Sequence, residues 1–189
     1  MNANQEYPSE SPSAWLVQRK EKGTTMSEAL TFFDTLPPAK LDELIGTWRG
    51  SGLRTGHPID GVLEGYGWYG KDFSGSNNVQ PLLFRNGPEN VVALNPTLMP
   101  IKLLVRHPEW FRRKAARLIF TALCPLLRTT RPRARMRMME HRGVISATMI
   151  YDDLPILDTF RRVDHNTMLG LMDLRDMTKP FFFTLHRDG

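Results

Sequence analysis

The stretch Gly46–Gly52, which reads GTWRGSG, constrains the fold of this chain more than any other part of the sequence. In an extended segment alternate side chains point to opposite faces, so Trp48 shares one face with Gly50 and Gly52, while Thr47, Arg49 and Ser51 lie on the other. Glycine weakens a strand unless the strand bends or another backbone or a ligand lies close to it. The repeated glycines therefore indicate that this face lies at a crowded barrel end or at the floor of a pocket. We therefore predict that Trp48 is an aromatic plug that closes one end of a small β-barrel. The alternative is that Trp48 is an ordinary core aromatic.

Three later segments reinforce this motif: Gly67–Lys71 (GWYGK), residues 151–156 (YDDLPI) and residues 158–164 (DTFRRVD). Together the four segments resemble the bacterial and fungal proteins that have an N-terminal GXWXG domain and a companion C-terminal domain of unknown function 4334. The resemblance covers about residues 27 to 187. It implies no particular activity, because the family is named for its motif.

The GTWRGSG segment is also similar to the opening strand of calycin-type barrels, which include lipocalins, fatty-acid-binding proteins and the haem-binding nitrobindins. This second resemblance covers only the segment itself, so it is an analogy about fold and not about function. Through the nitrobindins it implies haem as an alternative cofactor, with His57 or His141 as the iron ligand. The residues themselves show no independent axial-ligand signature, and they predict no cofactor.

The length of 189 residues suits one domain with a sizeable core. We expect a disordered tail over residues 1–23 and a single barrel domain over residues 24–189. Within that domain the GXWXG part covers 27–95, a helical basic insertion covers 96–132, and a C-terminal β-meander covers 133–187. A single cysteine and the lack of an apolar signal-peptide core make a cytoplasmic location the default expectation, with peripheral membrane binding as its alternative.

The predicted elements are helices followed by a series of strands. Thr24, Thr25 or Ser27 caps a first helix, which Pro37 and Pro38 end. After residue 132 arginines alternate with small or apolar residues, the period of a strand with one buried face. Turn signals divide the rest of the chain into further strands of an antiparallel meander. The predicted fold is therefore α+β: a calycin-like antiparallel β-barrel or half-barrel with N-terminal helices and a basic amphipathic helix.

Positive charge is concentrated between residues 102 and 142, where 12 Lys or Arg accompany two Glu for a net charge of +10. The rest of the chain has 13 basic and 18 acidic residues, a net charge of −5. Residues 108–123 show helical spacing of apolar residues, with Arg112, Arg113 and Arg117 on the other side. This helix is predicted either to cover the barrel as a lid with a solvated arginine face or to dock on an anionic membrane surface. Nucleic acid is not an expected partner, because no recognised binding motif accompanies the arginines.

The residue pattern favours a binding site inside the barrel for a small apolar or amphipathic ligand. Aromatic and methionine side chains suit the walls of such a site. The predicted wall residues are Trp48, Trp68, Tyr69, Met136, Met138 and the run Phe181–Phe183, with Phe182 at its centre. Lys71, Arg142 or Arg162 would hold an acidic head group. His57 is predicted to lie near the pocket mouth, with an ordinary exposed loop imidazole as the alternative.

A cofactor-free enzyme, such as an isomerase, cyclase or decarboxylase, is the alternative function. Asp158 or Asp152 would act as acid or base beside Tyr151 and an arginine, with a carboxylate pKa raised by the barrel interior. A charge inside a barrel is costly unless it is paired or bound by a ligand, so an inward Asp158 marks a candidate site. Three alternatives are open: this face points outward, Asp158 pairs structurally with Arg162, or Asp152 and Asp153 lie in an exposed turn.

The histidines show no metal-ligand spacing, and no neighbouring Cys or carboxylate completes a tetrahedral set, so no zinc site is expected. Phosphate-loop, dinucleotide, nucleophile-elbow and kinase motifs are absent from the sequence. Cys124 lies in an apolar stretch and is expected to be a buried, inert thiol.

Overall fold

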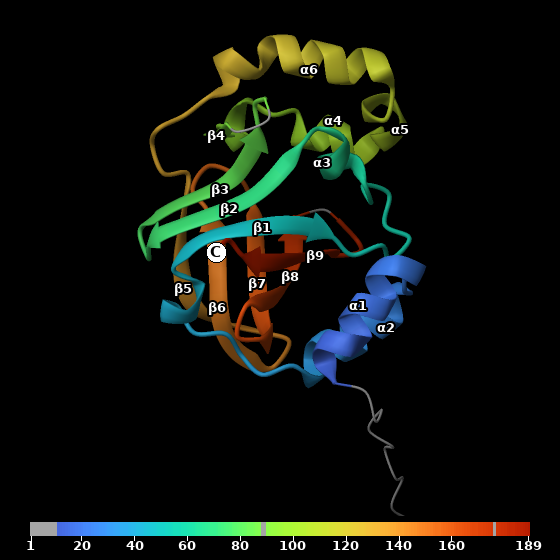
Figure 1. The fold of residues 1–189 in the computed structure, drawn as a ribbon, viewed down its shortest axis with the longest axis vertical. Coiled ribbons are helices and arrows are strands. Elements are labelled where there is room, and N and C mark those ends of the chain that lie inside the picture. The colour runs from blue at the N-terminus through green and yellow to red at the C-terminus, as the bar shows by residue number, and fades with distance from the viewer. Residues whose placement is uncertain (1–10, 88–89, 176) are drawn as a thin grey trace, which may run out of the picture.

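Eight antiparallel strands close into a β-barrel at the centre of the molecule (Figure 1). The computed structural model describes residues 11–87, 90–175 and 177–189. Around the barrel the strands follow the order β1, β9, β8, β7, β6, β5, β3, β2, and β2 pairs again with β1, while β4 extends the sheet beside β3. Their bounds are β1 (Gly46–Gly52), β2 (Trp68–Gly75), β3 (Asn78–Arg85), β4 (Val91–Ala93), β5 (Ala134–His141), β6 (Val144–Tyr151), β7 (Ile156–Asp164), β8 (Thr167–Leu174) and β9 (Phe181–Arg187). The fold is therefore α+β with an antiparallel barrel, as the sequence predicts.

The strand order brings the N-terminal and C-terminal parts of the chain into one barrel. β1, β2 and β3 form one meander, and β5 to β9 form a second. The two meanders join where β1 pairs with β9, and again where Val79 of β3 pairs with Ala134 of β5. The barrel interior therefore depends on both halves of the chain.

Two N-terminal helices, α1 (Pro12–Lys22) and α2 (Met26–Thr35), pack on the outer face of β7, β8 and β9 (Figure 1). The predicted start of α2 is confirmed by a capping box. The Thr25 hydroxyl accepts a hydrogen bond from the Glu28 N–H, and the Glu28 carboxylate accepts one from the Thr25 N–H. The helix ends before the two prolines, which cannot continue its hydrogen-bond pattern.

Helix α1 corrects the expectation of a disordered tail over residues 1–23. Residues 12–22 are helical, the Ser11 side chain caps them, and Leu16 is buried in the cluster that the N-terminal helices form with the barrel. A polar composition suggested disorder, but Leu16 and Trp15 pack against the cluster and Lys20 donates a hydrogen bond to Thr184 of β9, and such tertiary contacts stabilise a short helix. Residues 1–10, where the rest of that expectation falls, lie outside the described part of the chain.

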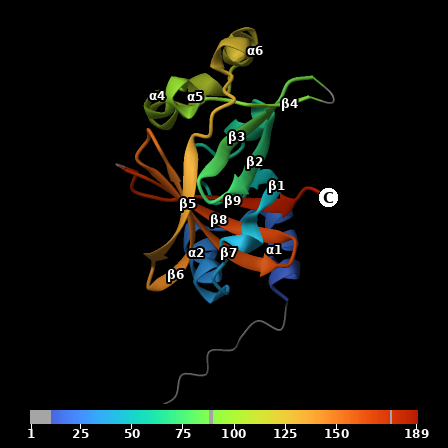
Figure 2. The ribbon, with the colours of Figure 1, turned by 90° about the vertical axis from the view of Figure 1, so that its left-hand side faces the viewer.

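Residues 96–132, called the lid below, cross one end of the barrel as short helices (Figures 1 and 2). Its elements are the 3₁₀ turn η2 (Pro96–Leu98), α4 (Ile101–Arg106), α5 (Pro108–Phe111) and α6 (Lys114–Leu127). The sequence predicts one helix over 108–123, but the structure breaks it after Phe111. At the break Arg112 donates hydrogen bonds to the carbonyl oxygens of Pro58 and Asp60, at 2.7 and 3.1 Å. The remaining short turns of the chain are η1 (Asp42–Leu44) and α3 (Val62–Gly65).

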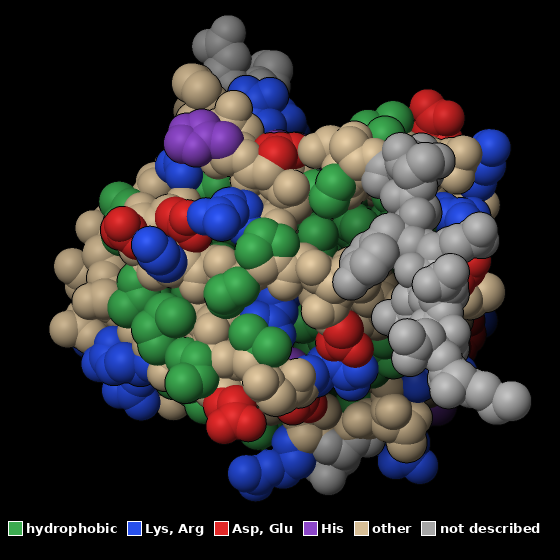
Figure 3. All heavy atoms as spheres, turned by 90° about the horizontal axis from the view of Figure 1, so that it is seen from below, with side chains coloured by type: hydrophobic (Ala, Val, Ile, Leu, Met, Phe, Trp, Pro, Cys, Tyr) green, Lys and Arg blue, Asp and Glu red, His purple; other side chains and the backbone are tan. Residues whose placement is uncertain are grey.

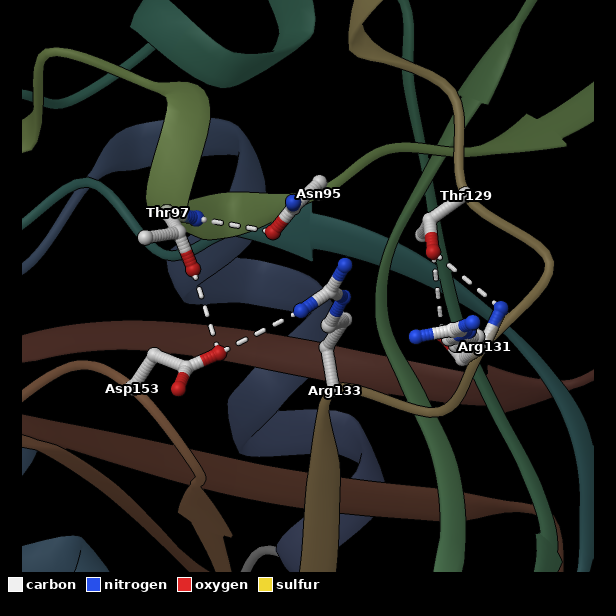
Figure 4. A network of polar contacts seen from close by, with 6 residues as sticks. All are labelled: Asn95, Thr97, Thr129, Arg131, Arg133 and Asp153. Carbon is white, nitrogen blue, oxygen red and sulfur yellow. Dashed lines mark hydrogen bonds and ion pairs between the residues drawn. The ribbon is translucent and has the colours of Figure 1, made fainter.

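Both ends of the lid are attached to the turn between β6 and β7 (Figure 4). Before α4, the Thr97 hydroxyl donates to a carboxylate oxygen of Asp153 at 3.3 Å. After α6, an Arg133 nitrogen lies 3.4 Å from the same oxygen. Asn95 supports this attachment by accepting a hydrogen bond from the Thr97 N–H at 3.1 Å. One carboxylate therefore holds the beginning and the end of the lid against the barrel.

Candidate functional site

A cavity of about 370 Å³ lies between the end of the barrel and the lid. Its walls come from β2, β3 and β6 to β9, from α3, and from the lid. Nearly all of the lining side chains are apolar, and the exceptions are Lys71, Asp158 and the hydroxyl groups of Tyr66 and Tyr151. The Tyr66 hydroxyl donates to the Phe111 carbonyl oxygen of the lid at 2.9 Å. Apolar cavities of roughly 300–1,000 Å³ with a few polar groups are typical of small-molecule sites.

Lys71 and Asp158 form a buried ion pair in the wall of this cavity. The Lys71 Nζ lies 2.8 Å from the Asp158 Oδ2, and the two side chains are 3% and 1% exposed. The ammonium group also donates a hydrogen bond to the Pro81 carbonyl oxygen at 3.1 Å. A charge this far from water is tolerated only when it is paired, so the two residues depend on each other.

Three aromatic rings surround the Lys71 ammonium. Its nitrogen lies 5.8, 5.7 and 5.0 Å from the ring centres of Trp68, Tyr151 and Phe183 respectively. Each distance is within the range of a cation–π interaction, which is stronger where water is excluded. The rings therefore stabilise the positive charge and exclude water from the pair.

A β-bulge in β2 is what points Lys71 into the barrel. Strict alternation from the inward Trp68 would send Lys71 outward with Tyr69. The pairing of β2 with β3 shifts register around Gly70, so that Trp68 and Lys71 are both buried. Gly70 has a φ of +150°, and a Cβ there would lie 1.8 Å from the Trp48 carbonyl oxygen. Only glycine fits this position, and it decides where the lysine points.

Burial shifts the pKa of two acidic groups in the cavity. Loss of hydration raises the pKa of Asp158 above its ordinary value of 3.8, and the Lys71 ammonium offsets part of that rise. Loss of hydration also raises the pKa of the Tyr151 phenol well above 10.0, and the Asp158 charge adds to the rise. Acidic groups with shifted pKa values in a cavity are typical of functional sites.

The ion pair retains hydrogen-bonding capacity for a ligand. An ammonium group has three N–H donors, and in the described part of the chain Lys71 directs them at two acceptors, Asp158 and Pro81. Oδ2 of Asp158 has only the ammonium beside it, and Oδ1 is buried without a hydrogen-bond partner among the described residues. Buried polar atoms are costly when they stay unpaired. One donor and one acceptor are therefore available to a polar group inside the cavity.

The structure brings four of the predicted site residues together around the cavity: Trp68, Lys71, Tyr151 and Asp158. The face of β7 that carries Asp158 points inward, and Asp158 pairs with Lys71 and not with Arg162. Of the predicted run Phe181–Phe183, the first and third rings line the cavity, and Phe183 approaches the ammonium more closely than the other two rings. Alternation along the Phe181–Phe183 run was the available signal, because it separates the middle ring from the outer two.

Tyr69, Met138 and Phe182 do not line the cavity, contrary to the prediction. Tyr69 lies on the outside of the barrel, where its hydroxyl donates to Asp188. Met138 is exposed because this part of β5 pairs only with β6, so the hairpin projects beyond the barrel. Phe182 faces the outside of β9 and packs against Phe33 of α2, with ring centres 5.9 Å apart. Each position follows from strand pairing that the sequence pattern did not reveal.

Trp48 is a buried member of the barrel core and does not line the cavity. It is fully buried in the barrel, its indole N–H donates to the Leu44 carbonyl oxygen at 2.7 Å, and the Arg187 guanidinium lies 4.4 Å from its ring centre. Met136 is likewise buried in the barrel core without lining the cavity. The motif acts on the cavity through Gly50, where a Cβ would lie 2.4 Å from the Trp68 ring. The second glycine of GXWXG thus leaves room for an indole in the cavity wall.

Three predicted polar site residues also lie away from the cavity. Arg142 is in the turn between β5 and β6, where it donates to the Asp34 carboxylate of α2 at 2.7 and 2.6 Å. Arg162 pairs with Glu43 beside a separate polar cavity of about 260 Å³. Asp152 is exposed in the turn after β6, which agrees with the alternative that Asp152 and Asp153 lie in an exposed turn. Arg142 and Asp152 are exposed and Arg162 is half-buried, so all three charges remain near water.

The predicted roles of the histidines are not supported by their positions. His57 is neither at the cavity mouth nor exposed: its Nδ1 accepts from the Ile59 N–H at 3.3 Å and its ring packs against Phe181. Burial lowers the pKa of both His57 and His141, and neither residue lines the cavity. Within the described ranges no group of three His, Cys, Asp or Glu residues is arranged to hold a metal ion. Cys124 is buried, as predicted.

The face opposite the lid carries side chains of mixed character. Figure 3 shows this face, on which hydrophobic side chains are interrupted by acidic and basic ones. The polar cavity beside Arg162 is lined by charged and polar residues and Met168. The candidate site is therefore the cavity beneath the lid.

Family comparison relates this architecture to known sequences. Residues 31–87, which contain β1 to β3, match the family described as GXWXG protein. Residues 132–187, which contain β5 to β9, match the domain of unknown function DUF4334. The chain combines a GXWXG segment with a DUF4334 segment. In this protein the two segments supply the two meanders of one barrel, and most of the lid lies between them.

A solved structure extends the comparison to nearly the whole chain. The chain is similar to the crystal structure of a protein from Thermomonospora curvata, with 27% sequence identity and a TM-score of 0.68. The match covers 94% of this chain and 99% of the other. None of the curated proteins matches the sequence significantly. These matches do not test the resemblance of the Trp48 strand to calycin-type barrels, which stays a prediction.

Proposed function

We propose that this protein binds a small, largely apolar molecule with one neutral polar group, in the cavity beneath the lid. The observation that carries this proposal is the buried ion pair of Lys71 and Asp158 in a wall of mostly apolar side chains. Burial of the apolar part of a ligand stabilises the complex by about 25 cal/mol per Å². The ion pair fixes the orientation of the ligand by binding its polar group.

The charges of the cavity favour a neutral polar group over the acidic head group that the sequence suggests. Lys71 and Asp158 together carry no net charge, so an entering carboxylate would meet Asp158 as well as Lys71. Two carboxylates close together in an apolar cavity repel strongly. A hydroxyl group can instead donate to Asp158 and accept from Lys71, and a carbonyl oxygen can accept from Lys71. We therefore expect an alcohol or a ketone in this site.

The first test compares two ligands with the same hydrocarbon chain. Decanol is expected to bind at least about tenfold more tightly than decanoate near pH 8, where the free acid is ionised. Isothermal titration calorimetry measures both dissociation constants. Decanoate affinity equal to or greater than that of decanol would contradict the proposed role of the ion pair.

A matched pair of lid variants tests the place of binding. Ala116 of α6 lines the cavity, whereas Ala115 beside it is exposed. Ala116→Trp should fill the cavity and weaken decanol binding by about tenfold or more, because the ligand loses the space for its chain. Ala115→Trp is the control and should leave the affinity within about twofold. Equal affinity in the two variants would place the ligand elsewhere.

The raised pKa values of Asp158 and Tyr151 favour a second candidate function, which is proton transfer on a bound ketone. The Asp158 carboxylate would remove a proton from the carbon next to the carbonyl group. The electron pair of that C–H bond would form a C=C bond while the C=O π pair moves to the oxygen, and the resulting enolate oxygen would accept a hydrogen bond from Lys71. Return of the proton to the same or a conjugated carbon would regenerate the carboxylate, as in an isomerase.

Proton exchange in heavy water tests this second candidate. Wild-type protein should exchange the protons next to the carbonyl of methyl nonyl ketone faster than buffer alone, as measured by loss of their NMR signals. Asp158→Asn should still bind the ketone but exchange at the buffer rate, because an amide is not a base. Ketone that binds to wild-type protein without faster exchange would leave the binding function and remove the enzymatic one.

A further inference from the structure

The outermost helix of the molecule exposes an apolar face. In Figures 1 and 2, α6 lies at the far edge of the lid, away from the barrel. Leu118, Ile119 and Leu126 of this helix are 72%, 60% and 74% exposed, and Leu123 beside them is 45% exposed. Their spacing places them on one side of the helix, while Cys124 faces the protein and is buried. Exposed apolar side chains that gather on one helix face mark a surface for a partner or a membrane.

Unpaired basic residues flank this apolar face. The lid contains eight Lys or Arg residues and a single acidic residue, Glu109. All eight basic residues are exposed and make no salt bridge with any residue in the described ranges: Lys102, Arg106, Arg112, Arg113, Lys114, Arg117, Arg128 and Arg131. An apolar helix face accompanied by exposed basic residues is complementary to a membrane surface that contains anionic lipid.

The mouth of the cavity opens on the same surface. Ile119 and Leu123 line the cavity and are also exposed, and the same is true of Leu98 and Leu103 in the first part of the lid. The cavity wall is therefore continuous with the apolar face of α6. Among the described residues no helix is long and apolar enough to cross a membrane, and α6 has 14 residues. The surface suits a helix that lies in the plane of the membrane interface.

We propose that the lid docks on anionic membranes, with Leu118, Ile119 and Leu126 inserted among the lipid chains and the basic residues against the head groups. In this orientation the cavity mouth faces the apolar phase, so a water-insoluble ligand can enter without crossing water. The docking itself does not depend on which ligand the cavity binds.

Co-sedimentation with lipid vesicles tests the proposal. At about 0.1 M salt the protein should bind vesicles of equal parts phosphatidylglycerol and phosphatidylcholine at least about tenfold more tightly than pure phosphatidylcholine vesicles. About 0.5 M salt should weaken the binding, because it screens the attraction between exposed charges. Equal binding to both vesicle types, or no binding, would overturn the proposal.

Two groups of variants separate the apolar and the basic contributions. Leu118→Asp with Leu126→Asp should reduce binding to anionic vesicles by about tenfold or more, and so should Arg113→Glu with Lys114→Glu. The matched control is Ile145→Asp, which changes an exposed apolar residue of β6 outside the lid and should leave binding unchanged. Full vesicle binding by either lid double variant would contradict the proposal.

Two further measurements distinguish docking from its competitors. Analytical ultracentrifugation should show the same oligomeric state for wild-type protein and the Leu118→Asp, Leu126→Asp variant. A dimer that dissociates in this variant would assign the face to a second copy of the chain and overturn membrane docking. Ala116→Trp should bind vesicles as wild type does, even though its cavity is filled. Decanol binding therefore tests the ligand proposal, and vesicle binding tests the docking proposal separately.

Discussion

Replacing Lys71 by methionine is expected to lower the free energy of unfolding by about 3–5 kcal/mol near pH 8, because the variant leaves the Asp158 carboxylate buried without a counter-charge. Methionine keeps the length and the apolar stem of the side chain, so the loss reports the charge and not a cavity. Urea unfolding followed by circular dichroism measures the change. A loss below about 1 kcal/mol would mean that water reaches the pair, contrary to its burial in this structure.

The pH dependence of this loss identifies Asp158 as its cause. The folded-state pKa of Asp158 is already above 3.8, and removal of Lys71 takes away the effect that lowers it. A carboxyl group with a raised folded-state pKa contributes most to stability when protonated, and that contribution is lost as pH rises through the folded-state value. The difference between wild type and Lys71→Met should therefore be smaller near pH 5 than near pH 8.

A double variant supplies the control. Lys71→Met combined with Asp158→Leu removes both charges and leaves an apolar wall, so most of the lost stability should return at each pH. Decanol binding should not return, because the orienting polar groups are gone. A double variant as unstable as the single one would show that packing around Lys71, and not the unpaired carboxylate, causes the loss.

Replacing Trp48 by alanine is expected to lower the free energy of unfolding by about 3–5 kcal/mol, because a fully buried indole leaves a large space in a closed barrel. The substitution also leaves the Leu44 carbonyl oxygen without the indole donor that binds it at 2.7 Å. Urea unfolding measures the loss. Decanol affinity should stay within about twofold of wild type, since Trp48 does not line the cavity.

Trp110→Ala is the matched control for the size and chemistry of the side chain. Trp110 lies in the lid, is 47% exposed and stacks on His107. Its replacement should change the free energy of unfolding by no more than about 1 kcal/mol. If both tryptophan variants lost stability equally, the plug role of Trp48 would have no support. If only Trp48→Ala lost decanol binding while still folded, the plug would also be part of the ligand site.

Local signals in the sequence correctly predict several elements of the barrel. The alternation of arginine with apolar residues after Pro132 predicts β5, and β5 is a strand with Ala134 and Met136 buried. Thr25 predicts the start of α2 because its side chain bonds to the backbone only three residues away. Signals of this kind involve neighbouring residues, so no knowledge of the tertiary structure is needed to read them.

The two-residue alternation predicts the wrong face for a side chain where a β-bulge shifts the strand register, and the wrong burial where a strand lacks a neighbouring strand. Lys71 and Trp68 share the barrel interior only because a bulge at Gly70 shifts the register of β2. Met138 points to the same face of β5 as Met136. It is nevertheless exposed, because at Met138 the strand β5 pairs with β6 and not with β3. Register depends on the partner strand, and a single strand sequence does not specify it.

The sequence by itself determined the antiparallel strands, the α+β class, the capped N-terminal helix, the glycine-flanked Trp48 and the basic character of the lid. Each of these depends on residue type and short-range spacing. Only the tertiary structure decided that Lys71 pairs with Asp158, that this pair lies in an apolar cavity, and that α6 exposes its leucines. The ion pair joins residues that are 87 positions apart in the sequence. The exposure of the α6 leucines depends on which side of the helix packs against the rest of the protein. Long-range contacts and burial are properties of the closed barrel, and they exist only once both meanders have paired.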